Sequence, residues 1–279
     1  MADVGTTLRA VYQRPMSFLD RLGSQLAFYV KALAWTPRAI HRYKKEILRL
    51  LAEVTLGSGA LAVIGGTVGV ITAMSFFTGT EVGLQGYAAL NQIGTAAFSG
   101  FVSAYFNTRE IAPLVAGIAL AATVGCGFTA QLGAMRISEE VDALEVMAIP
   151  SLPFLVTTRI IAGLIAIVPL YVVGLLSSYF ATRLTVTQFF GQSTGTYDHY
   201  FNQFLPPGDV LWSFGKVLVF AVLVIMIHCY HGYYASGGPA GVGIAVGHAV
   251  RTSIVAINVV DLFLSMAIWG TTTTVRLAG

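Results

Sequence analysis

The chain has 279 residues, of which 56% are hydrophobic and only 10% are charged, with a formal net charge of +3 at pH 7. Soluble domains carry about 25% charged residues, so this composition excludes an ordinary soluble protein and predicts an integral membrane protein. Long apolar runs favour membrane-spanning helices over a barrel, whose strands would alternate polar and apolar residues, and the small net charge gives no reason to expect nucleic-acid binding.

Residues 1–53 are predicted to precede the first span as cytoplasmic or interfacial helices. Apolar residues recur at helical spacing through residues 18–33, with polar residues between them, which is typical of a helix lying in the membrane interface. The densest basic cluster of the sequence follows at residues 38–49. By the positive-inside rule this cluster, and the N-terminus with it, is expected in the cytoplasm.

Residues 54–279 are predicted to form one membrane domain. Its five spans are expected at residues 54–77, 111–132, 155–180, 210–230 and 252–269, which puts the C-terminus outside. Gly79, Gly83 and Gly86 predict a loop after the first span. Residues 95–106 are too short to cross a bilayer and predict a re-entrant or surface helix, and residues 231–250 predict a glycine-rich cytoplasmic loop.

A line of small residues at i, i+4 spacing runs along the second predicted span. Its members are Gly117, Ala121, Gly125, Thr129 and Gly133. Small residues let helices approach closely. The line therefore predicts either an ordinary contact within the helix bundle or the wall of a dimer interface or substrate cleft, and the sequence leaves both open.

A short acidic helix is predicted at residues 137–149, between the second and third spans. Ser138 is expected to cap its start. Its acidic residues are Glu139, Glu140, Asp142 and Glu145, and Leu144 belongs to its apolar stripe. One interpretation is a solvated linker. The other is a coupling helix, whose apolar stripe fits a groove on a soluble partner while its acids meet basic groups there.

Charged residues inside the spans are the other candidate site. Asp261 lies deep in the fifth span, where a carboxylate is either a proton or ion site or a buried packing anchor. A single such group favours the anchor. Arg109 and Glu110 begin the second span and are expected to pair with each other or to lie at a lateral entrance.

No catalytic motif and no metal site are predicted. His228 and His231 could share a helix face, but a structural metal site needs about four ligands. The chain is therefore expected to carry no cofactor and no enzymatic chemistry. Its spans offer few polar groups, which suits an apolar cargo such as a lipid rather than a polar solute. The energy for transport would then come from another protein.

Three motifs resemble the MlaE/YrbE permeases, the membrane subunits of ABC transporters that work with MCE-domain proteins. They are Arg-Glu-Ile-Ala-Pro at 109–113, Gly-Phe-Thr-Ala-Gln-Leu-Gly at 127–133, and Glu-Glu-Val-Asp-Ala-Leu-Glu-Val-Met at 139–147. The likeness extends from about residue 40 to the end. It implies an all-α permease with an interfacial N-terminal helix and five spans, which pairs with a second permease around a lipid pocket.

The resemblance also implies the partners. A soluble ATPase dimer, which binds ATP and magnesium itself, would dock on residues 137–149, and MCE-domain proteins would bind on the outer face of the plasma (inner) membrane. Residues 147–153 look like the B-type YrbE subunit of mycobacterial-type Mce systems, which implies an A-type partner and import of a fatty acid, mycolic acid or sterol. Residues 121–127 lack the arginine that the single-permease form carries, which puts in doubt a lipid-headgroup contact by such an arginine.

Two other functions remain as alternatives. The first is a secondary carrier that is driven by protons through Asp261. The second is a non-transporting scaffold that anchors an outer assembly to the membrane.

Overall fold

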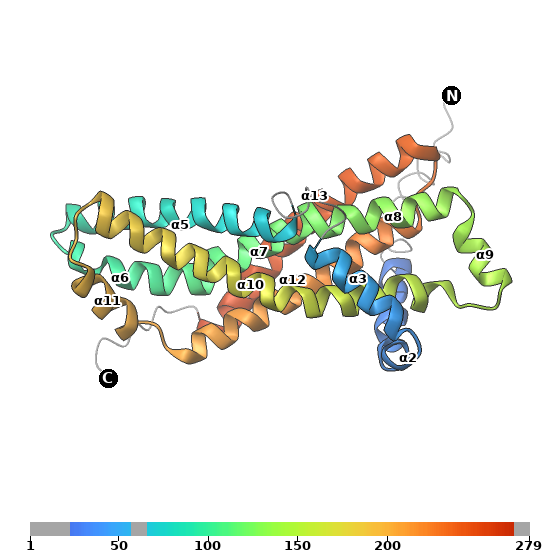
Figure 1. Ribbon diagram of the computed structural model, residues 1–279, viewed down its shortest axis with the longest axis horizontal. Coiled ribbons are helices and arrows are strands. Elements are labelled where there is room, and N and C mark those ends of the chain that lie inside the picture. The colour runs from blue at the N-terminus through green and yellow to red at the C-terminus, as the bar shows by residue number, and fades with distance from the viewer. Residues whose placement is uncertain (1–22, 57–65, 271–279) are drawn as a thin grey trace, which may run out of the picture.

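The computed structural model describes residues 23–56 and 66–270. Regular structure in these ranges is entirely helical, and five helices are long and apolar enough to cross a membrane. This confirms the predicted all-α membrane fold. The long helices run along the longest axis of an elongated bundle (Figure 1).

The helices follow one another with short connections. At the N-terminal end, residues 23–34 are helical, followed by α2 (Thr36–Arg42) and α3 (Lys44–Leu56). The first two spans are α5 (Thr67–Gln92) and a run of η1 (Ala96–Phe98), α6 (Ser99–Val102), η2 (Ser103–Ile111), α7 (Ala112–Leu120), η3 (Ala121–Gly125) and α8 (Cys126–Ile137). Then come α9 (Glu140–Val146), η4 (Pro153–Thr157), α10 (Thr158–Leu184), η5 (Thr185–Phe189), α11 (Thr194–Gln203), α12 (Pro207–Tyr233) and α13 (Gly238–Trp269).

The predicted loop at Gly79, Gly83 and Gly86 is wrong, because α5 continues through all three. A Cβ on Gly79 would lie 2.8 Å from the Cα of Ser178 in α10. A Cβ on Gly83 would lie 2.9 Å from the side chain of Thr185, at the start of η5. Gly79 and Gly83 therefore allow a close approach of α5 to the third span, and Gly86 lies against Val102 of α6, so the glycines serve helix packing rather than a turn. The helix α5 covers Thr67–Gln92 and so runs past the predicted end of the first span at residue 77. Residues 57–65 of that predicted span lie outside the described ranges.

The predicted re-entrant helix at residues 95–106 is also wrong. Residues Ala96–Ile137 form a single helical run of 42 residues, about 60 Å long at 1.5 Å per residue. The helix continues past residue 106 through polar residues that are buried against α10. There the Asn107 amide nitrogen donates to the hydroxyl of Thr182 at 2.9 Å, and the Thr108 hydroxyl donates to the carbonyl of Ala104 at 2.6 Å. Because these donors have partners inside the bundle, the helix does not have to end there.

The predicted glycine-rich loop at residues 231–250 shrinks to residues 234–237. Gly237 has a φ of 88°, a left-handed conformation that glycine adopts without strain, and α13 begins at the next residue. A Cβ on Gly241 would collide with the backbone of Ser236. The glycines thus make a tight turn between two antiparallel helices, and the fifth span starts at Gly238 rather than at residue 252.

Two ends of the bundle are distinct in Figure 1. The α9 end carries α9 with α2 and α3 close by, and the α11 end carries α11 across the tips of α5 and α6. At that end Arg183 donates two hydrogen bonds of 2.8 Å to the Asp198 carboxylate. These bonds hold the pKa of Asp198 below its ordinary value and fasten α11 to the third span.

Candidate functional site

Four carboxylates stand exposed at the α9 end, on Glu139, Glu140, Asp142 and Glu145. The helix that carries them spans only Glu140–Val146, shorter than the predicted residues 137–149. Ser138 does not cap it. Its hydroxyl donates to the carbonyl of Ala134 at 3.0 Å and ends α8 instead. The chain turns the corner at Glu139, which has a φ of 60°.

Two apolar residues of α9 face its own bundle. Val141 is fully buried, and Leu144 is half-buried and packs against the same core. The docking of residues 137–149 on a soluble protein stays a prediction, and Val141 and Leu144 are not available for it. The accessible apolar side chains of this segment include Val146 and Met147, which are 88% and 60% exposed, and Ile137, which is 37% exposed.

The acids of α9 differ in how firmly they are held. Asp142 pairs with Arg136 at 2.6 Å. Glu145 accepts from the Ser151 hydroxyl at 2.7 Å, and that hydroxyl also lies 2.7 Å from the Tyr233 hydroxyl of α12. Glu139 and Glu140 make no ion pair with any described residue. This pair of acids therefore presents uncompensated negative charge at the corner between α8 and α9.

A buried ionic cluster joins the second, fourth and fifth spans. Lys216 of α12 is fully buried, and its Nζ lies 2.6 Å from a carboxylate oxygen of Asp261 and 3.3 Å from one of Glu110. The same Nζ is 2.8 Å from the Ser265 hydroxyl, which donates to Glu110 at 2.8 Å. Asp261 thus has a cationic partner, which supports the packing anchor.

Lys216 also resolves a defect in the second span. Its Nζ donates to the carbonyl oxygen of Arg109 at 2.7 Å. Four residues further on stands Pro113, which has no N–H to give that carbonyl its usual helical hydrogen bond. An unpaired carbonyl in a bilayer costs several kcal/mol. Lys216 therefore serves two carboxylates and also the carbonyl oxygen that Pro113 leaves without a helical hydrogen bond.

Arg109 and Glu110 do not pair with each other. Arg109 lies 2.6 Å from Asp209 at the start of α12 and 4.0 Å from the ring centre of Tyr105. Asp209 in turn accepts from the Trp269 indole at 2.9 Å. Both residues therefore tie the second span to α12 and α13, and the predicted local pair is not formed.

The line of small residues packs within the chain. A Cβ on Gly117 would lie 3.3 Å from Phe220, one on Gly125 would lie 2.7 Å from the His228 ring, and one on Gly133 would lie 2.9 Å from Val242. Ala121 is fully buried, and the Thr129 hydroxyl lies 2.8 Å from Nδ1 of His228. This is the first of the two interpretations, a contact within the bundle, with α12 and α13 as the neighbours.

The two histidines of α12 do not act together. His228 is buried against Gly125 and Thr129, whereas the ring of His231 stacks on that of His248, 6.3 Å between centres. Among the described residues, no three His, Cys, Asp or Glu side chains gather as metal ligands would.

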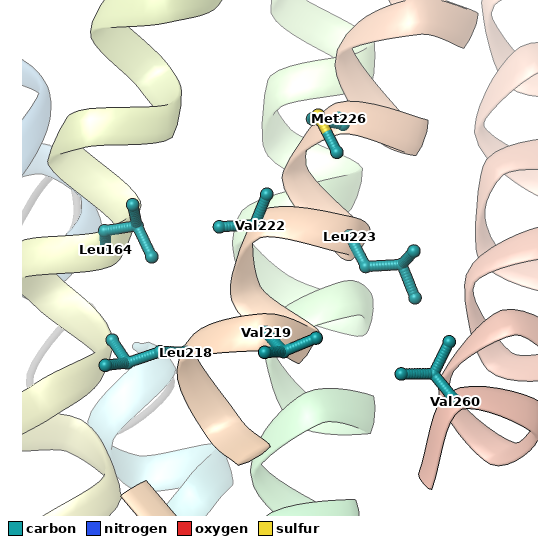
Figure 2. A pocket seen from close by; sticks show the side chains of 7 residues that line it. All are labelled: Leu164, Leu218, Val219, Val222, Leu223, Met226 and Val260. Carbon is teal, nitrogen blue, oxygen red and sulfur yellow. The ribbon is translucent and has the colours of Figure 1, made fainter. Parts of the chain in front are cut away.

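An apolar pocket of about 510 Å³ opens on the side of the bundle. Figure 2 shows Leu164 of α10 on one side, Val260 of α13 on the other, and residues of α12 between them. Its lining consists of Leu164, Leu218, Val219, Val222, Leu223, Met226 and Val260. A surface with no polar group at this depth suits hydrocarbon chains and offers nothing to a polar solute.

The sequence of this chain matches the family model "Permease MlaE" over residues 57–267. The chain belongs to the MlaE permease family. The five apolar helices and the family together make it a multi-pass protein of the inner membrane.

Curated relatives agree with this family. A probable ABC transporter permease protein of Rickettsia bellii is 31% identical over 196 residues, which is 70% of this chain and 76% of that one. A probable ABC transporter permease of Rickettsia conorii is 28% identical over 92% of this chain and 95% of its own. The intermembrane phospholipid transport system permease protein MlaE of Haemophilus influenzae is 26% identical over 72% and 77%.

Several polar residues of this MlaE-family permease were not predicted as part of the site. Lys216 stands alone in an apolar run, which is the same signal that pointed to Asp261, and a search for both charges would have found the pair. Asp209 lies at a helix start, where an acid is common. Arg159 is buried and donates to the Gln131 amide oxygen at 3.2 Å, while Gln131 donates to Glu53 of α3.

Proposed function

We propose that this permease is the membrane subunit of an ABC transporter that moves lipids. Two observations carry the proposal: the charged corner at the α9 end of a chain that belongs to this family, and an apolar pocket of about 510 Å³ that is lined only by apolar side chains. A relative in Haemophilus influenzae is named for intermembrane phospholipid transport. An apolar cargo needs an apolar binding surface, which this chain has. The energy for its movement would come from another subunit.

The energy would enter at α9. A separate ATPase dimer, holding ATP and magnesium itself, docks there with basic groups near Glu139 and Glu140 and an apolar contact on Val146 and Met147. Charge complementarity of this kind guides association, and a small buried apolar contact holds the complex. Val141 and Leu144 fix α9 to the bundle, so that a push on α9 moves α8 and α10 with it. The α9 end is then the cytoplasmic end.

The remaining parts of the transporter follow from the resemblance. A second permease, of the A type beside this B-type chain, would lie against α13, whose exposed residues are largely apolar. MCE-domain proteins would meet the α11 end on the outer side. In that setting the cargo is a fatty acid, mycolic acid or sterol and the direction is import.

Co-purification of the ATPase tests the docking surface. We expect the double variant Glu139→Lys/Glu140→Lys to lose the ATPase from the purified complex by at least tenfold, because two attractive contacts become repulsive. The variant Glu139→Asp/Glu140→Asp keeps both charges and serves as the control, with normal ATPase recovery. If the double variant retains the ATPase, or the control loses it equally, α9 is not the docking site.

Asp261 gives the test of the carrier alternative. The chain alone, reconstituted in vesicles, would move its cargo under a pH gradient only if it were a proton-driven carrier, and Asp261→Asn would abolish that transport. Because Lys216 already neutralises Asp261, we expect no such transport without ATPase and ATP. The scaffold alternative fails if lipid uptake depends on the ATPase.

A further inference from the structure

The N-terminal helical segment, residues 23–56, presents three different faces. The first is buried on the bundle and includes Phe28, Ala32, Ala39 and Leu50. Phe28 packs edge-on against the Tyr230 ring of α12, 5.4 Å between centres. This contact fixes which sides of the segment point away from the protein. In Figure 1 the segment lies at the α9 end and to one side of the long helices.

The second face is an exposed apolar row. It consists of Leu26, Val30, Leu33, Ile40 and Leu48. The first three recur at i, i+4 and i+7, so they share one side of the helix, and Leu26 and Val30 are 61% and 65% exposed. Side chains of this kind, next to membrane spans, belong in the acyl-chain region of a bilayer.

The third face is an exposed basic row. Its members are Lys31, Arg38, Arg42, Lys44 and Lys45. Residues 23–56 contain only two acids, Glu46 and Glu53. Glu46 is occupied by Arg49 at 2.6 Å, and Glu53 accepts from Gln131. No ion pair joins the basic row to a carboxylate of the described residues, so its charge is available to a ligand.

One exposed aromatic ring indicates the depth of this row. The guanidinium of Arg38 lies 5.4 Å from the ring centre of Trp35, and Trp35 is 37% exposed. Tryptophan and tyrosine prefer the level of the lipid headgroups. A guanidinium held against such a ring is therefore held at the level of the phosphates.

We propose that this basic row binds the phosphate groups of anionic phospholipids on the membrane face at the α9 end. The apolar row enters the acyl region, and the basic row lies beside it at the height of the headgroups. An acidic protein would satisfy the charges but not the adjoining apolar row, whereas a bilayer with anionic lipids satisfies both. These lipids are bound at the permease surface and are distinct from any cargo.

The test uses the full-length permease in nanodiscs of phosphatidylcholine and phosphatidylglycerol in equal amounts. After gentle extraction, native mass spectrometry gives the ratio of the two lipids that stay bound. A basic residue near an anionic surface contributes about fivefold in binding. The triple variant Arg38→Gln/Arg42→Gln/Lys45→Gln should therefore lower the bound ratio of phosphatidylglycerol to phosphatidylcholine at least tenfold, and 1 M salt should weaken it in the wild type.

The matched control exchanges the charges without removing them: Arg38→Lys/Arg42→Lys/Lys45→Arg should keep the wild-type ratio. All these side chains are exposed, so both triple variants should fold. An unchanged ratio in the glutamine variant overturns the proposal, as does an equal fall in the control. If the glutamine variant keeps its lipids but loses a co-purifying protein, the row binds that protein instead, which also overturns the proposal.

Discussion

Single glycines in the second span decide how closely α12 can approach it. At Gly125 the nearest neighbour is the ring of His228, which is fully buried and held by Thr129. The ring has no room to swing aside. Gly127, two residues further along the same helix, has nothing within 4 Å of the place that a Cβ would take.

We therefore predict opposite effects of the same substitution. Gly125→Ala places a methyl group 2.7 Å from the His228 ring and should lower stability by about 1–3 kcal/mol through overpacking. Gly127→Ala should leave stability unchanged or raise it by up to about 1 kcal/mol, because alanine favours the helix. Thermal unfolding of the purified variants measures both. Shifts of the same sign would show that the contact at His228 does not govern the packing here.

At the residue scale, the sequence located the important positions better than their partners. Gly125 and Thr129 were identified by spacing alone, and Asp261 by its depth in an apolar run. His228 is 99 residues from Thr129 in the sequence, and Lys216 is on α12 whereas Asp261 is on α13. No local pattern in the sequence links such partners. Pairing between spans depends on how the helices rotate, which a single sequence does not determine.

The ionic cluster is the main polar connection between elements. Lys216 of α12 bridges Asp261 of α13 and Glu110 of the second span, and it supplies the hydrogen bond that Pro113 denies to Arg109. Removing one charge from such a group leaves the others buried without a partner. Removing opposite charges together leaves far less uncompensated charge.

Lys216→Met should consequently lower the free energy of unfolding by about 3–5 kcal/mol. The double variant Lys216→Met/Asp261→Leu should recover at least half of that loss, because the Asp261 charge disappears while Glu110 keeps its hydrogen bond from Ser265. Arg251→Met, which changes an exposed cation outside the cluster, is the control and should be close to neutral. Chemical denaturation in detergent gives all three values, and a double variant as unstable as the single one would contradict the argument.

The elements themselves were predicted in number but not in extent. Five spans followed from apolar length, yet each of the five long helices runs beyond its predicted bounds at one end or both. Glycine caused two of the errors: at residues 79–86 it serves helix packing, and at 237–241 it serves a tight turn. The short apolar length of residues 95–106 caused another, because the helix continues through Asn107 and Thr108, which are hydrogen-bonded inside the bundle.

At the scale of the whole molecule, the five spans are unequally covered. The span of α13 is the least buried of the five. Of its most apolar 18-residue stretch 17% is buried, against 61% for the second span. Its exposed apolar residues include Val255, Val259, Leu262 and Phe263. Because α13 is the most exposed of these spans, we expect a second permease to cover its apolar face.

A photo-reactive benzoylphenylalanine at position 255 or 262 tests this arrangement in native membranes. Because both side chains lie on the open face of α13, we expect a crosslink that adds the mass of a second permease, and mass spectrometry of the adduct tells a second copy from a different chain. The same probe at Leu176 of α10, which is also exposed, should give no permease adduct. Crosslinks to a permease from position 176 but not from 255 or 262 would move the interface to α10, and with it the side of the bundle on which a shared lipid pocket could form.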